Sequence, residues 1–186
     1  LDYLDKTSLV ENTVFIYVVD QKYSLGEHGF FDKRLIYEES LRMPFVIRYP
    51  GEIPAGTRNS DIILNIDFSA LMADYAGIQN QTTIQGASFR NNLIGYTPSD
   101  WRKSMYYRYW LHRIERPGHF GLRNKRFKLV FFYGQPLGMK GAMKTVTNPA
   151  WEFYDLKKDP QENHNAYQDA EYADVIKTMK TELLIQ

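Results

Sequence analysis

An unbroken apolar run from Val14 to Val19 constrains the fold of this chain more than any other feature. Its residues are mostly β-branched, and such a run is typical of a strand covered on both faces, as in a parallel sheet. A second apolar run, Pro44–Tyr49, predicts another strand. Apolar residues at helical spacing then follow Asp67, and Gly77 closes the expected helix. This part of the chain predicts an α/β fold with pieces of a mainly parallel sheet.

The second part of the chain is richer in aromatic residues. Three short aromatic runs separated by loops predict strands of a small antiparallel sheet: Met105–Trp110, Phe127–Tyr133 and Trp151–Leu156. Residues 170–184 repeat apolar side chains at helical spacing, so we expect a helix there. The predicted domains are therefore residues 1–100, part of a large α/β domain, and residues 101–186, a small sheet plus helix.

Charge and cysteine content exclude several classes of partner and site. The 23 basic residues balance 22 acidic ones to a net charge of +1, which favours neither nucleic acid nor a membrane surface as a partner. No apolar run approaches the roughly 18 residues of a membrane helix, and no basic segment precedes an apolar one as in a signal peptide. The chain has no cysteine, so it forms neither disulfides nor thiolate metal sites and offers no cysteine nucleophile.

Candidate ligands for a cation and an anion follow the first strand. Asp20 and Gln21 offer adjacent side-chain oxygens, which hard cations such as Ca²⁺ prefer. Lys33 offers a point charge suited to sulfate or phosphate, and His28 lies between it and the Asp-Gln pair in the sequence. A metal and a lysine around an anion form the cradle that sulfuryl or phosphoryl transfer requires. The alternative is a loop that only turns, followed by a solvated charge run at residues 32–34.

The series of motifs along the chain resembles the C-terminal portion of the type I sulfatases, a formylglycine-dependent family of the alkaline phosphatase-like superfamily. Bacterial glycan sulfatases that carry Asp-Gln at the metal are the most similar members. The motifs lie in the family's order and span nearly the whole chain: Asp20-Gln21, Leu25–Gly29, Asp32–Arg34, Tyr37–Arg42, Asn65–Asp67, Ala76–Ile78, Gln85–Phe89, His119–Arg123, Arg126–Leu129, Trp151–Leu156 and Asp159–Asn165.

The resemblance implies a fold, a chemistry and roles for particular residues. The family's large domain has a mainly parallel sheet between helices, and its small domain has a four-stranded antiparallel sheet with one helix. By this resemblance Asp20 and Gln21 bind Ca²⁺ and Lys33 contacts the sulfate. The substrate would be a sulfated carbohydrate, with His28, His119 and Arg123 as further contacts. The alternative for His119 and Arg123 is a strand-end pair that joins two parts of the fold.

The family's nucleophile is a formylglycine made in a C/S-x-P-S/A-R motif, and this motif is absent here. Tyr96-Thr97-Pro98-Ser99 echoes it but has Tyr where Cys or Ser must stand. Lys22 also replaces the family's usual glycine after the metal pair. We therefore expect the nucleophile upstream of Leu1, and a chain that is inactive by itself.

Two other functions stay open at this stage. One is a truncated or degenerate relative of the sulfatases that is not catalytic. The other is part of a phosphodiesterase or phosphonate hydrolase of the same superfamily. The resemblance also implies a periplasmic or secreted location for full-length members. Strands of a large sheet that lack their neighbours invite pairing with other chains, so self-association is a further expectation.

Overall fold

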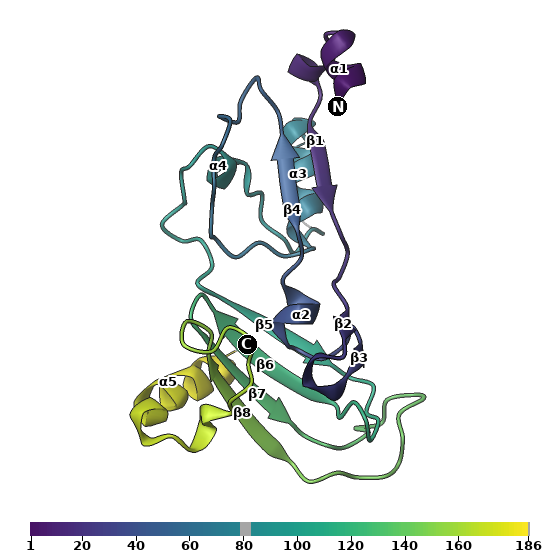
Figure 1. The fold of residues 1–186 in the computed structure, drawn as a ribbon, viewed down its shortest axis with the longest axis vertical. Helices are drawn as coiled ribbons and strands as arrows, with labels where there is room; N and C mark the ends of the chain where they lie inside the picture. Colours follow the sequence, from purple (N-terminus) through teal and green to yellow (C-terminus); the bar gives the residue numbers. More distant parts are fainter. Residues whose placement is uncertain (79–82, 186) are drawn as a thin grey trace. The chain divides into compact units, whose positions relative to one another are not determined.

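The computed structural model describes residues 1–78 and 83–185, and Figure 1 shows its ribbon. The chain divides into two compact units, and neither is continuous in sequence. Unit 1 consists of Leu1–Asp20 and Met43–Arg102, and unit 2 of Gln21–Arg42 and Lys103–Gln186.

Unit 1 combines a strand pair with short helices. Its elements are α1 (Asp2–Lys6), the 3₁₀ turn η1 (Val10–Asn12), β1 (Phe15–Val18), β4 (Phe45–Arg48), α3 (Asp67–Tyr75) and α4 (Arg90–Leu93). Helix α3 lies beside the β1–β4 pair (Figure 1). The core between them is built on the buried residues Leu71, Phe89 and Leu93. Gly77 follows α3 with φ of 68°, a left-handed conformation that ends a helix without steric cost to glycine.

The two apolar runs of unit 1 form strands as predicted, but these strands pair antiparallel to each other. Phe15 lies opposite Arg48, and Val18 opposite Phe45. The expectation of a mainly parallel sheet did not give the direction of this particular pair, because an apolar run indicates burial of a strand and does not identify its neighbour. Burial is also one-sided within this chain, since Tyr17 is 56% exposed and Val46 58%.

Unit 2 is built on a four-stranded antiparallel sheet in the order β5–β6–β7–β8. Its elements are β2 (Ser24–Leu25), the 3₁₀ turn η2 (Glu27–Gly29), β3 (Phe31–Asp32), α2 (Glu38–Leu41), β5 (Ser104–Tyr109), β6 (His119–Asn124), β7 (Phe127–Phe132), β8 (Ala150–Asp155), the 3₁₀ turns η3 (Ala166–Gln168) and η4 (Ala170–Tyr172), and α5 (Ala173–Leu183). The three aromatic runs form β5, β7 and β8, as predicted. Strand β6 was expected only through the family resemblance.

Both faces of this sheet are covered. Helix α5 packs on one face (Figure 1), where the core is formed by Leu122, Leu129, Phe153, Ile176, Met179 and Leu183. On the other face, the segment Leu35–Tyr37 packs against Val130, Phe132 and Tyr154. Because the second cover comes from residues before 43, the segment 21–42 belongs with the small sheet in the structure. The expected domains had placed it within residues 1–100.

No helix in the described ranges, 1–78 and 83–185, is long and apolar enough to cross a membrane.

Candidate active-site loop

The segment Gln21–Arg42 of unit 2, which we call the lysine loop, carries three of the predicted site residues: Gln21, His28 and Lys33. Its first part is a tight hairpin in which Ser24 pairs with Asp32. Gly26 and Gly29 turn this hairpin with φ values of 129° and 67°, which glycine adopts without steric cost. The Gly-Glu-His-Gly motif is therefore a turn that brings the chain back toward Lys33.

The main chain at Lys33 is held from several sides. The Gln21 amide nitrogen donates to the Lys33 carbonyl oxygen, and the Lys33 N–H donates to Asp32 Oδ1 at 2.7 Å. One residue further, the Arg34 carbonyl oxygen accepts a 2.8 Å hydrogen bond from the Tyr107 hydroxyl on β5. The position from which the Lys33 side chain projects is thus fixed by the loop itself and by the sheet.

A carboxylate with two arginine partners lies directly beside Lys33. Arg34 Nη1 donates to Asp32 Oδ1 at 2.6 Å, and Arg116 also donates to this carboxylate. Burial would raise the pKa of Asp32, but the Lys33 N–H and the two guanidinium groups outweigh it and hold the pKa below its usual range. Asp32 is therefore ionised at neutral pH and anchors the loop electrostatically.

The two expected calcium ligands belong to different units. Asp20 is the last residue of the first segment of unit 1, and its carbonyl oxygen accepts a 2.8 Å hydrogen bond from Asn65 Nδ2. Gln21 begins unit 2, and its amide nitrogen is engaged by Lys33. An amide whose nitrogen donates in this way presents its oxygen as an acceptor. The donor chemistry of this pair fits a hard cation.

His28 belongs to a second cluster on the lysine loop. Its ring stacks on Tyr37 with centroids 4.0 Å apart, and its Nε2 lies 3.4 Å from Glu39 Oε2. With Glu162, these residues place three metal-ligating atoms within 4.8 Å of one another. However, Glu162 Oε1 lies 2.6 Å from the Lys128 ammonium, which already neutralises that carboxylate. The cluster is therefore better explained as a charge network than as a metal site.

His119 and Arg123 lie on β6 and make contacts within unit 2. The His119 ring is fully buried, and Arg123 donates to both carboxylate oxygens of Glu38 at 3.1 and 2.9 Å. Arg123 thus joins β6 to the lysine loop. These are packing contacts, and the predicted role of both residues in sugar binding stays a prediction.

Sequence analysis did not single out four charged residues in or against the lysine loop: Lys128 and Glu162, which are buried, and Glu38 and Glu152, which are partly buried. Lys128 and Glu162 have 0% and 2% of their surface exposed. Burial would raise the pKa of Glu38, but hydrogen bonds from Arg123 and the charge of Lys128 lower it to about 2. A signal was present at Lys128, because this lysine interrupts an otherwise apolar strand.

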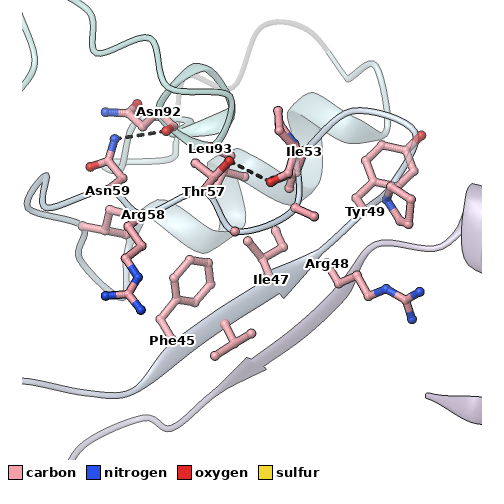
Figure 2. A pocket seen from close by; sticks show the side chains of 16 residues that line it. Phe45, Ile47, Arg48, Tyr49, Ile53, Thr57, Arg58, Asn59, Asn92 and Leu93 are labelled. Atoms are coloured by element: carbon pink, nitrogen blue, oxygen red, sulfur yellow. Dashed lines mark hydrogen bonds between the residues drawn. The ribbon is translucent and has the colours of Figure 1, made fainter.

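Unit 1 has a pocket of its own, of about 860 Å³. It is lined by β4 and the loop that follows, and Figure 2 shows Phe45 and Ile47 on one wall and Thr57–Asn59 on another. Asn59 Nδ2 closes one end with a 3.0 Å hydrogen bond to the Asn92 carbonyl oxygen. No predicted site residue lines this pocket.

A comparison with protein families decides the assignment. The model described as "N-sulphoglucosamine sulphohydrolase, C-terminal" matches residues 26–186. The chain belongs to this sulfatase family. The resemblance inferred from the motifs is confirmed, and so is the α/β fold of a sulfatase C-terminal portion.

Individual relatives of this chain agree with the family. An N-acetylglucosamine-6-O-sulfatase of Bacteroides thetaiotaomicron is 44% identical over 179 residues, which are 93% of this chain and 30% of that protein. A solved structure of a protein in complex with its substrate, D-glucosamine-2-N,6-O-disulfate, has a TM-score of 0.85 and 42% identity, over 98% of this chain and 35% of the other. A phosphonate monoester hydrolase of Agrobacterium radiobacter shares the fold, with a TM-score of 0.77 at 23% identity, over 98% of this chain and 36% of the other. The chain thus spans about a third of the length of these relatives.

Proposed function

We propose that the complete protein containing this chain hydrolyses a sulfate ester on a glycan, and that the chain supplies the metal and sulfate contacts of the lysine loop. The alignment with an N-acetylglucosamine-6-O-sulfatase over 93% of this chain carries the proposal. The substrate in the similar solved structure, a glucosamine with a 6-O-sulfate, supports a 6-O-sulfated glucosamine as the substrate class.

Lys33 is the proposed sulfate contact. An ammonium held at a fixed place stabilises the charge that develops on sulfate oxygens as the S–O bond breaks, because it need not reorganise during the reaction. Three features support this role: the Lys33 main chain is bonded to Gln21 and Asp32, and the next carbonyl is bonded to Tyr107.

Asp20 and Gln21 are the proposed ligands for Ca²⁺. They offer a carboxylate and an amide oxygen, and Ca²⁺ takes about six to eight such oxygens. The remaining ligands would come from other parts of the complete protein. When bound, the cation would supply positive charge to the sulfate oxygens, in addition to the charge of Lys33.

The proposal extends to sugar contacts, partners and location. His28, His119 and Arg123 are proposed contacts to the sugar, and a sulfated carbohydrate is the proposed partner. Self-association through exposed strands is proposed for the chain by itself. A periplasmic or secreted location is proposed on the family resemblance alone.

Substitution of Lys33 in the complete protein tests the function. Lys33→Ala should lower kcat on a 6-O-sulfated glucosamine by about 10²–10³, the usual effect of removing one preorganised group. The values of kcat and kcat/KM should fall together, because the contact strengthens in the transition state. Lys177→Ala removes an exposed lysine on α5 and is the matched control. An unchanged kcat with only a raised KM would show that Lys33 is an ordinary binding contact.

The same assay separates the rival chemistry. The phosphonate monoester hydrolase resembles the chain at an identity that shows the fold alone. Preferential hydrolysis of a phosphonate monoester over the sulfated sugar by the complete protein would replace the sulfatase proposal.

A further inference from the structure

A single buried lysine connects the small sheet of unit 2 to the lysine loop. Lys128 lies on β7, where 0% of it is exposed. Its Nζ donates to the Ile36 carbonyl oxygen at 2.7 Å and lies 3.0 Å from Glu38 Oε1 and 2.6 Å from Glu162 Oε1. Of these three oxygens, the Ile36 carbonyl oxygen accepts a hydrogen bond, and the two carboxylate oxygens are ion-pair partners of the ammonium. Two of the three, on Ile36 and Glu38, belong to the lysine loop.

Glu162 and Arg123 complete the charges around this lysine. Glu162 Oε2 accepts a 2.7 Å hydrogen bond from the Glu38 N–H, so it holds the loop main chain as well as Lys128. Arg123 lies opposite Lys128 in the β6–β7 register and binds the Glu38 carboxylate. Two cations, Arg123 and Lys128, therefore pair with the Glu38 and Glu162 carboxylates, and Glu39 adds a further carboxylate within 4.8 Å of Glu162.

The backbone of β6 is shaped for the same contact. A Cβ added to Gly121 would lie 2.8 Å from Ile36 Cδ1 and 2.6 Å from the Leu129 carbonyl oxygen. Ile36 is fully buried against the sheet at this point. The glycine thus admits the loop side chain to a depth that no other residue would allow.

These contacts, at Ile36 and Glu38, lie three and five residues beyond Lys33 on the same short segment. We infer that Lys128 is a positioning residue: through Ile36 and Glu38 it fixes the lysine loop on the sheet, and thereby sets where the Lys33 ammonium lies. This role rests on the proposed function of Lys33, whereas the attachment of the loop does not.

Hydrogen exchange in the chain tests the attachment directly. Lys128→Met keeps the length of the side chain and removes its charge, leaving Glu38 and Glu162 without their shared cation. We expect amide exchange across residues 33–42 to become at least about tenfold faster, with much smaller changes in β8 and α5, because local opening exposes only the released segment. Glu162→Gln is the milder second variant and should shift exchange in the same direction. Lys177→Met, an exposed lysine on α5, is the matched control and should change nothing.

Two exchange results would overturn the attachment. One is unchanged exchange at residues 33–42 in both variants. The other is acceleration that is uniform over β5–β8 and α5, since this would make Lys128 a general stabiliser of the unit.

Kinetics of the complete protein separate the positioning role from the proposed function. Lys128→Met should lower kcat in the direction of Lys33→Ala, with little change in KM. If the loop is released and kcat is unchanged while Lys33→Ala lowers it, the positioning role is wrong and the proposed function stands. If Lys33→Ala also leaves kcat unchanged, the proposed function fails, while faster exchange at residues 33–42 still supports the attachment.

Discussion

Protonation of His119 should weaken unit 2 in mildly acidic solution. The ring is fully buried between aromatic neighbours, with its centroid 4.9 Å from that of Phe132 and 5.7 Å from that of Tyr109. Its Nδ1 lies 2.8 Å from the Pro117 carbonyl oxygen, which can only accept, so the proton of the neutral ring sits on Nδ1. Nε2 has no hydrogen-bond partner in the part of the chain that the structure describes. A second proton would therefore enter a buried site without an acceptor.

The size of the effect follows from the shift in pKa. Burial lowers the pKa of His119 from 6.5 to about 4, although the Pro117 carbonyl opposes the shift. The unfolded chain therefore binds this proton more tightly than the folded one. The stabilisation is complete above the unfolded pKa and is lost as pH falls through the folded value. A pKa difference of one corresponds to about 1.4 kcal/mol, so protonation of His119 should lower the free energy of unfolding by about 3 kcal/mol. This is a large share of the typical free energy of unfolding of about 5–15 kcal/mol.

Urea unfolding of the chain between about pH 7 and about pH 4.5 would measure this loss, which should be about 2.5 kcal/mol at the lower pH. Glu38 contributes little in this range, because its folded pKa of about 2 makes its stabilisation fall mainly below pH 4.5. His119→Phe, which suits the aromatic surroundings, should flatten the pH dependence. His164→Gln, at an exposed position, is the control. Equal slopes for His119→Phe and the parent chain would refute the reasoning.

Three further predictions concern the chain by itself. It should not hydrolyse a chromogenic aryl sulfate with Ca²⁺ added, because it has no nucleophile motif; turnover above a heat-killed control would overturn this. It should bind Ca²⁺ weakly, since Asp20 and Gln21 supply too few oxygens; micromolar affinity in calorimetry that Asp20→Ala abolishes would be the contrary result. It should self-associate through the exposed face of β1 and β4, where Tyr17 and Val46 lie; light scattering from a clean monomer, with strong exchange protection in β1, would show otherwise.

Local patterns predicted the three aromatic strands and the last helix of unit 2, because those elements depend on local spacing. Strands β5, β7 and β8 and helix α5 each carry an aromatic run or a helical repeat in their own sequence. Strand β6 has no such run, since Gly121 and Arg123 interrupt its apolar residues. Both residues contact the lysine loop: Gly121 leaves room for the Ile36 side chain, and Arg123 binds the Glu38 carboxylate.

The packing of the lysine loop against the sheet could not be predicted in the same way. Phe127, Leu129 and Phe131 form one apolar row along β7, and Lys128 stands in the other row with Val130 and Phe132. The second row is buried because Leu35–Tyr37 covers it. Those residues lie about ninety positions earlier in the chain, and neither segment by itself indicates that it packs against the other. Only the opposite charges of Lys128 and Glu38, considered together, would have suggested the contact.

The order of the two units along the chain has a practical consequence for dissecting this protein. Residues 43–102 of unit 1 form an insertion between the two segments of unit 2. A truncation that starts at Lys103 would keep the sheet and α5 but strip the cover from Val130 and Phe132 and leave Lys128 without two of its three partners. Such a product should aggregate. A smaller stable protein would instead keep Gln21–Arg42 and replace the insertion by a flexible linker, or supply that segment as a separate peptide.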